Sequence, residues 1–481
     1  MGVRSVNGSM ETTTDNRSQP TERFARLRAD EYAYLDEQGQ IYLDYTGAGL
    51  PARSQLAAHF ARVTGSCYGN PHSENPTSAA STALIEETRA RVLEHLNADP
   101  AEYAAIFTAN ATGACRLVGE AFPFRRGSRL VLPLDNHNSV NGLREFARAR
   151  GARVVYVPFD TPDLRIGDGA MDEALPRRRG RPGLLAYPAQ SNFTGVRHSL
   201  DWIAPARERG YTVLLDAAAY LPTSSLDLSR VKPDFVTASW YKVFGYPTGV
   251  GCLVARRDAL ARLRRPWFSG GTIHVVSAQG GWHRMAEDET AFEDGTLNFL
   301  AIPDVATGLD HLAAVGLSSV AGHVADLTGR LLDGLRALRH ANGAPLVRVY
   351  GPEDTERRGG TVALNVLDPT GHVVDERAVG RDSAARGISL RTGCFCNPGA
   401  GEEAFAISRG LLHGKAGRLE AGTLDEYLAL LGMPSGGAVR VSLGIASSPA
   451  DLDAFLGFVE DSYRDRSAEA AADRLAPRLR C

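Results

Sequence analysis

Strand and helix patterns alternate through the first half of this chain, and that alternation restricts the fold more than any other feature. Val- and Leu-rich runs with strand character are separated by helical stretches. Strands joined this way are mostly parallel, and their apolar character indicates a sheet covered on both faces. We therefore predict an α/β fold. The expected strands are residues 105–108, 130–134, 154–159, 184–189, 211–216, 234–240 and 250–255, and the expected helices are 113–121, 140–150 and 200–208.

Four regions are expected along the 481 residues. Residues 1–20 are Ser-, Thr- and Asn-rich and predicted to be disordered, and residues 21–340 form a large domain whose N-terminal part packs with the small one. Residues 160–182 are an Arg-, Gly- and Pro-rich surface loop. Residues 341–465 form a smaller α+β domain, and residues 466–481 a solvated or frayed tail. Other expected strands are 41–45, 347–350, 361–366, 388–392 and 439–443, and other expected helices are 78–96, 301–314, 319–340 and those starting at 374, 424 and 450.

Composition excludes several function classes. The net charge of −3 gives no basic surface for nucleic acid or an anionic membrane, and no apolar run approaches a membrane span of ~20 residues. The first twenty residues lack the apolar core of a secretory signal, so we expect a cytoplasmic protein. The six cysteines are then expected to be free thiols, and the Cys394-Phe-Cys396 spacing is too tight for the usual zinc pattern.

Lys242 is the first candidate for chemistry. It follows the strand pattern 234–240 and precedes a turn and a second apolar run, 250–255. A lysine desolvated between two strands has a lowered pKa, and its neutral amine can form a Schiff base with pyridoxal 5'-phosphate (PLP). Asp216 ends an apolar strand 26 positions earlier and would suit the pyridine nitrogen. Either residue alone could be ordinary, a solvated loop lysine or a helix-capping aspartate.

Further candidates lie where other predicted strands end. The stretch Phe107-Thr-Ala-Asn-Ala-Thr-Gly113 opens a helix and could bind a phosphate, with Thr112 adding its hydroxyl, although a plain capped helix start fits equally. His137 could stack on a flat ring or move a proton, or could be a loop residue without a role. Arg440 is a charge in an apolar strand and needs an anion, for which a substrate carboxylate is the natural choice.

These stretches together resemble the fold-type I, class V PLP enzymes of the cysteine desulfurase branch, most of all the N-terminal desulfurase domain of molybdenum cofactor sulfurases. The resemblance runs over about residues 35–447 in the family's order. Its carrying stretches are Gly69-Asn-Pro-His-Ser73, Asp135-Asn-His137, Tyr187-Pro-Ala-Gln-Ser-Asn-Phe193, Leu215-Asp-Ala-Ala218, Ser239-Trp-Tyr-Lys-Val-Phe-Gly245, Phe268-Ser-Gly-Gly-Thr272, Phe292-Glu-Asp-Gly-Thr296 and Arg391-Thr-Gly-Cys-Phe-Cys-Asn-Pro-Gly399.

The resemblance implies a seven-stranded sheet, a homodimer and a role for each site residue. Lys242 carries PLP as a Schiff base, Asp216 contacts the pyridine nitrogen and His137 stacks on the ring. Cys396 receives sulfur as a persulfide, and Arg440 takes the carboxylate of L-cysteine. Asn192 lies near the cofactor hydroxyl or the substrate. The expected phosphate and cofactor contacts are Ala111, Thr112 and Ser239, with Thr296 reaching the phosphate from a second subunit.

The Cys loop carries one further expectation and one departure. In an extended loop Cys394 and Cys396 face opposite ways, so only one can point at the cofactor while the other packs inward. The resemblance selects Cys396 for the cofactor side, and the turn Asn397-Pro-Gly399 is expected to keep it exposed and mobile. The family's pattern has a third cysteine where this chain has Gly401, and the sulfurases continue into a further domain about where this chain ends. The sulfur acceptor is therefore unknown. Two rival readings stay open: a PLP-dependent C–S lyase or tailoring enzyme, and a non-catalytic sulfur-relay protein.

Overall fold

Seven strands form the central sheet of the computed structural model, which describes residues 18–178, 180–407 and 435–472 together with isolated positions 410, 412, 425, 426, 428, 433 and 475. The strand order is β2-β8-β7-β6-β5-β3-β4. All neighbours are parallel except β8, which is antiparallel to β2 and β7. The predicted α/β fold is confirmed. The strands are β2 (Tyr103–Thr108), β3 (Arg129–Pro133), β4 (Arg153–Val157), β5 (Gly183–Pro188), β6 (Thr212–Asp216), β7 (Phe235–Ser239) and β8 (Gly251–Arg256).

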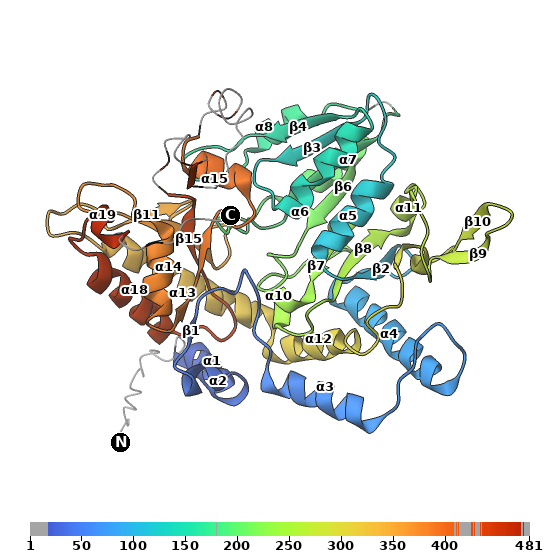
Figure 1. The fold of residues 1–481 in the computed structure, drawn as a ribbon, viewed down its shortest axis with the longest axis horizontal. Helices are drawn as coiled ribbons and strands as arrows, with labels where there is room; N and C mark the ends of the chain where they lie inside the picture. Colours follow the sequence, from blue (N-terminus) through green and yellow to red (C-terminus); the bar gives the residue numbers. More distant parts are fainter. Residues whose placement is uncertain are drawn as a thin grey trace, which may run out of the picture.

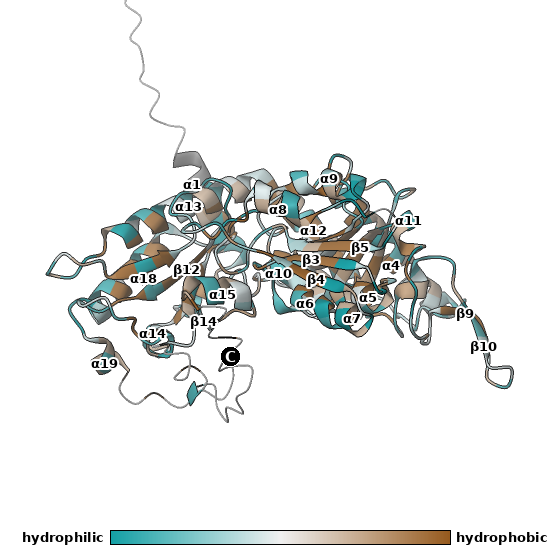
Figure 2. Cartoon of the chain, turned by 90° about the horizontal axis from the view of Figure 1, so that it is seen from above, coloured by the Kyte–Doolittle hydropathy of each residue, from teal (hydrophilic) through white to brown (hydrophobic). Residues whose placement is uncertain are grey.

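Helices cover both faces of this sheet because successive strand residues point to opposite sides. Ala104 and Ile106 of β2 pack with α5 (Ala111–Ala121) and α7 (Leu143–Ala149), whereas Ala105 and Phe107 belong to a second core. That second core includes α4 (Pro76–His95), α9 (Ile203–Glu208) and α12 (Pro303–Val315). Seen from above, the apolar strands lie between two layers of helices (Figure 2).

A second, antiparallel sheet forms beside the first, at the left in Figure 1. Its order is β11-β12-β15-β14, and α14 packs on it. The N-terminal segment joins this unit: β1 pairs with β13, and Arg28 of α1 forms an ion pair with Asp451 at 2.6 Å. The bounds are α1 (Ser18–Glu31), β1 (Ile41–Tyr42), α13 (Leu317–Ala337), β11 (Val347–Tyr350), β12 (Thr361–Val366), α14 (Glu376–Ala384), β13 (Ile388–Ser389), β14 (Arg391–Gly393), β15 (Ala438–Ser442) and α18 (Pro449–Tyr463).

The remaining elements are short or peripheral. The hairpin of β9 and β10 projects away from the body at the right of Figure 1. None of the helices in the described part of the chain is long and apolar enough to cross a membrane. These elements are α2 (Tyr34–Glu37), α3 (Arg53–Gly65), α6 (Asn138–Asn141), α8 (Asp168–Ala174), the 3-10 turn Leu200–Trp202, α10 (Trp240–Phe244), α11 (Arg257–Leu260), β9 (Ile273–Ser277), β10 (Trp282–Met285), the 3-10 turn Glu289–Phe292, α15 (Pro398–Ala404) and α19 (Ala468–Ala471).

Several sequence predictions differ from the structure. The expected surface loop 160–182 contains α8 and buries Leu164, Ile166 and Met171, because these apolar side chains pack into the core beside β4. The expected helix 140–150 is two helices that meet at Gly142. Residues 18–20 of the predicted disordered segment lie in α1, whereas residues 1–17 lie outside the described residues, as do Cys481 and most of the helix expected from residue 424.

Candidate functional site

The carboxyl ends of the central strands surround a cavity of about 160 Å³, which we call the Lys242 cavity. Ligands of α/β proteins bind at this edge of the sheet. Four polar or aromatic residues that line it were not predicted from the sequence: Asn110, Ser139, Gln190 and Tyr241. Each lies within two residues of a site candidate proposed from the sequence, and this closeness in the sequence could have identified it. The proposed residues lining it are Ala111, Thr112, His137, Asn192, Asp216, Ser239 and Lys242.

Lys242 stands on α10, a single helical turn between β7 and Gly245, whose φ is 77°. The sequence placed this lysine at a strand end, but β7 stops at Ser239 and the helical turn that follows stacks buried Trp240 on Phe244, 5.8 Å between ring centroids. Burial lowers the pKa of the Lys242 amine, and nearby Asp216 only partly opposes that shift. A neutral amine is the form that reacts with an aldehyde.

Asp216 and His137 form two walls of the cavity. Asp216 ends β6, and its Oδ1 accepts hydrogen bonds from the Ala218 amide at 3.0 Å and the Thr237 hydroxyl at 3.2 Å. Those bonds fix the orientation of the carboxylate. His137 caps α6, where its Nδ1 accepts from the Ser139 amide at 3.1 Å, so Nε2 carries the proton of the neutral ring. Burial lowers the pKa of His137 and favours that neutral form.

The N-terminus of α5 forms the opposite end of the cavity. Asn110 caps this helix by accepting from the Gly113 amide at 2.9 Å, and the Ser239 hydroxyl accepts from the Ala111 amide at 2.9 Å. The Thr112 and Ser139 hydroxyls are 2.6 Å apart. A helix N-terminus with adjacent hydroxyls favours an anion, and a phosphate group suits this end.

Arg440 has an anionic partner within the chain. Its guanidinium is buried and forms an ion pair with Asp44 at 2.8 Å, while Arg391 pairs with the other oxygen of the same carboxylate. Arg440 therefore does not need a substrate carboxylate to balance its charge, since Asp44 already supplies one. Arg440 does not line the Lys242 cavity, although it donates a hydrogen bond to the Asn192 carbonyl at 3.0 Å. Its Nε is buried without a hydrogen-bond partner among the described residues.

Cys396 lies on a folded loop. Phe395 and Cys396 have φ values of 53° and 54°, so the extended loop assumed from the sequence is wrong. Phe395 is buried, with the Arg440 guanidinium 4.9 Å from its ring centroid. Cys396 is exposed, Cys394 is half-buried, and Asn397 is buried rather than part of a free turn. Cys396 is not among the residues lining the Lys242 cavity.

Gly401, where the family pattern has a third cysteine, lies on α15 and is buried. A Cβ atom there would meet only Phe405, at 3.9 Å, so a side chain could start at this position without a clash. The other cysteines include two that pack as small apolar residues, since Cys115 and Cys252 are fully buried. Burial raises the pKa of the Cys252 thiol to about 12.

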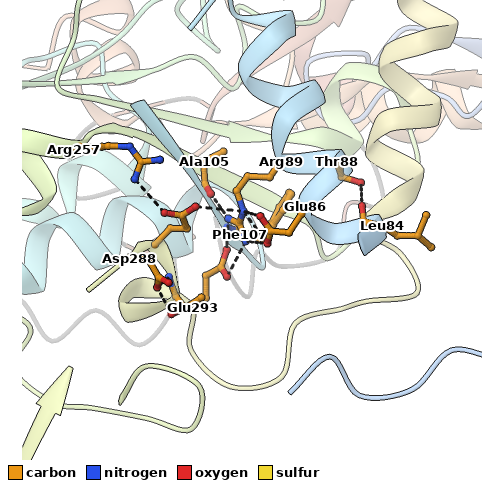
Figure 3. A network of polar contacts seen from close by, with 11 residues as sticks. Leu84, Glu86, Thr88, Arg89, Ala105, Phe107, Arg257, Asp288 and Glu293 are labelled. Carbon is orange, nitrogen blue, oxygen red and sulfur yellow. Dashed lines mark hydrogen bonds and ion pairs between the residues drawn. The ribbon is translucent and has the colours of Figure 1, made fainter. Parts of the chain in front are cut away.

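Thr296 is exposed and lies beside a different cavity of about 350 Å³, next to Thr108 and Gly113. Its segment is fixed by the buried ion pair of Arg89 and Glu293, 2.9 Å apart (Figure 3). Glu293 also accepts from the Phe107 amide at 2.8 Å, which ties the segment to the strand that leads into α5. Thr296 therefore does not reach the Lys242 cavity of its own chain.

The residues of the Lys242 cavity fit PLP. An amine with a lowered pKa, an oriented carboxylate and a histidine ring face a helix N-terminus with adjacent hydroxyls. Among the described residues, no cluster of His, Cys, Asp or Glu is suited to hold a metal ion.

Known relatives were compared with this chain. It is 35% identical to a molybdenum cofactor sulfurase of Arabidopsis thaliana and 37% identical to that of Homo sapiens, over 91% and 92% of its length. It covers 58% and 52% of those proteins, so it spans about half the length of the curated relatives it matches.

Solved structures share the fold. A cysteine desulfurase from Thermococcus onnurineus has a TM-score of 0.74 at 23% identity, covering 91% of this chain and 97% of that one. A cystine C–S lyase in complex with cysteine persulfide has a TM-score of 0.66 at 19% identity, covering 88% and 97%. The sequence matches the family description Aminotransferase class-V over residues 41–455. The chain thus belongs to the class V aminotransferase family, within which it is related to the molybdenum cofactor sulfurases.

Proposed function

We propose that this protein is a PLP-dependent L-cysteine desulfurase-like enzyme that carries sulfur on Cys396 as a persulfide. The observation that supports it most is the meeting of Lys242, Asp216 and His137 with the α5 N-terminus around one cavity. Class V aminotransferases are PLP-dependent enzymes, and the related sulfurases and desulfurases handle sulfur. The sulfur acceptor stays unidentified, because the chain spans about half of those sulfurases.

Each residue has a definite task in this proposal. Lys242 holds the cofactor through its neutral amine and later moves the proton from the substrate Cα. Asp216 would hold a proton on the pyridine nitrogen of the cofactor, and His137 and Asn192 would border its ring. The α5 N-terminus, Thr112 and Ser239 bind the phosphate. PLP, when bound, supplies the electron sink for the Cα carbanion.

The sulfur step conserves atoms and electrons without an added oxidant. The Cys396 thiolate forms an S–S bond to the substrate sulfur while the substrate Cβ–S bond breaks. The electron pair of that bond stays with the carbon skeleton, which takes up a proton and leaves as alanine. One L-cysteine and one thiol become one alanine and one persulfide.

Arg440 is proposed to receive the carboxylate of L-cysteine. The substrate carboxylate would then bind the Arg440 guanidinium beside Asp44 or in its place, and Asp44 would keep its ion pair with Arg391. A homodimer is also proposed, in which Thr296 reaches the phosphate of the second subunit, since in its own chain it lines a cavity other than that of Lys242. Light scattering tests the dimer, and a fully active monomer would contradict it. A cytoplasmic location remains a prediction.

Incubation of the PLP-loaded protein with L-cysteine tests the function. The expected products are alanine and, with reductant, sulfide in equal amounts, with a persulfide on Cys396 when reductant is left out. Cys396→Ser should abolish the persulfide and most turnover while the cofactor spectrum stays unchanged.

The rival activity is a C–S lyase, which the absent third cysteine at Gly401 and the shared fold with a C–S lyase both favour. It predicts pyruvate in place of alanine and normal turnover by Cys396→Ser. That pair of results would replace the desulfurase proposal. A protein that binds no PLP at all would point instead to a non-catalytic sulfur relay.

A further inference from the structure

We propose that the strand-end motif Asp135-Asn-His-Asn-Ser139 has a second role besides presenting His137: it positions Cys396 by clamping the Cys loop to the central sheet. The loop clamp is the set of hydrogen bonds that hold residues 395–397 to Asp135, Asn138 and Asn192. This inference rests on the proposed role of Cys396 as the sulfur carrier.

Three consecutive loop residues are held from the large sheet. The Phe395 carbonyl accepts from the Asn192 amide group at 2.7 Å, and the Cys396 carbonyl accepts from the Asn138 backbone N–H at 2.7 Å. The Asn397 amide group donates to Asp135 Oδ1 at 2.6 Å and to Asn192 Oδ1 at 3.0 Å. Two of these bonds thus hold the Phe395 and Cys396 carbonyls, which lie on either side of the Cys396 nitrogen and Cα.

The anchor of the clamp is itself fixed. Asp135 is fully buried, its Oδ1 also accepts from the Ser191 hydroxyl at 2.8 Å, and its Oδ2 lies 2.8 Å from His198 Nε2. Gly399 packs so closely on the Leu134 carbonyl that a Cβ atom there would overlap it. The loop is thus docked at its second cysteine and at the start of α15.

The backbone of the loop shows the effect of the clamp. Phe395 and Cys396 both adopt left-handed φ values of 53° and 54°, which side chains other than glycine rarely adopt. Such conformations are strained and persist where the surroundings hold them. The clamp and the buried Phe395 ring are those surroundings. Together they fix the direction of the Cys396 side chain, which stays exposed.

The motif also couples two parts of the site. His137 caps α6 at the position just before Asn138, whose amide holds Cys396. His137, which forms one wall of the cavity, and Asn138, which holds the Cys396 carbonyl, are therefore consecutive residues of one turn. Asn192, which lines the cavity, completes the link by contacting both Phe395 and Asn397.

One hydrogen bond of the clamp can be deleted with a matched control. Asn138 is the first residue of α6 and its side chain is exposed, so Asn138→Ala keeps the backbone N–H and should be neutral. Asn138→Pro removes that N–H and sets a ring methylene against the Cys396 carbonyl, at a helix position where proline is tolerated. The preceding residue, His137, has ψ of 150°, which proline allows.

Two measurements compare these variants. Hydrogen–deuterium exchange of the peptide covering residues 391–399, in the protein without substrate, should be faster in Asn138→Pro than in Asn138→Ala. With L-cysteine, persulfide formation on Cys396 should slow by roughly 10- to 100-fold in Asn138→Pro, the scale of an ångström misplacement of a reacting group. The cofactor spectrum and the spectral change on adding L-cysteine should be the same in both variants.

A swap adds a second test. Asn397→Asp places a second carboxylate beside that of Asp135 and should slow persulfide formation. Adding Asp135→Asn restores one donor and one acceptor between these two side chains and should recover part of the rate. Equal exchange in the two Asn138 variants, or persulfide rates within twofold, would overturn the clamp. If the wild type makes pyruvate and no persulfide, the proposed function fails, while the exchange comparison still decides whether the clamp exists.

Discussion

Removal of the Asp44 carboxylate isolates the buried ion pair beside the candidate site. Asp44→Ala leaves the Arg440 guanidinium, only 3% exposed, without the carboxylate that now lies 2.8 Å away. Breaking a buried pair from one side costs about 3–5 kcal/mol. Arg391 has half of its side chain exposed and regains water, so its share of the loss is about 0–1 kcal/mol. We expect the free energy of unfolding to fall by about 3–5 kcal/mol.

Urea unfolding of the cofactor-free protein measures this loss, because bound cofactor would itself stabilise the folded state. Two controls separate the contributions. Arg391→Ala should cost no more than about 1 kcal/mol. Arg440→Met, combined with Asp44→Ala, should recover much of the stability, because the uncompensated buried charge is then gone. A loss below about 1 kcal/mol in Asp44→Ala, or no recovery in the double variant, would show that Arg440 does not depend on this pair.

Three more predictions follow from other sites. The chain has three lysines, and borohydride reduction of the PLP-loaded protein should fix the cofactor to the peptide containing Lys242 and to neither Lys232 nor Lys415, as read by peptide mass. In the native protein iodoacetamide should label exposed Cys67 and Cys396 before buried Cys115 and Cys252, whose thiol pKa values burial raises, and equal labelling rates would contradict the burial. Burial lowers the pKa of His323 below 6.5. As the pH falls, the unfolded chain therefore binds a proton at His323 more readily than the folded chain does, which favours unfolding. Wild type should therefore lose more unfolding free energy between pH 7.5 and 5.5 than His323→Gln does, and an equal loss would argue against this assignment.

Local patterns were enough to predict the large sheet and the residues at its edge. Asp216 and Ser239 end apolar runs, and the carboxyl ends of parallel strands meet at one edge, so their shared cavity follows from the pattern. Lys242 instead lies in the helical turn after β7, in which Trp240 stacks on Phe244, a contact that strand propensity does not register.

Contacts between distant segments were beyond a local reading. Arg440 was correctly read as a charge that needs an anion, but its partner, Asp44, lies 396 residues away in the chain. The left-handed backbone at Phe395 and Cys396 depends on hydrogen bonds from Asn138 and Asn192, so the two residues alone give no sign of it. Three-dimensional packing decides such features after local preferences are set.

The joining of the N-terminal segment to the small sheet has a consequence for synthesis on the ribosome. Arg28 and Asp44 find their partners 423 and 396 residues later, in Asp451 and Arg440. At a synthesis rate of about 5–20 residues per second, Arg440 is made roughly 20–80 s after Asp44. The residues around Lys242 are complete well before that. The nascent chain is thus expected to form its cofactor end first and to close the Arg440 end last, with the N-terminal segment exposed to chaperones in the interval.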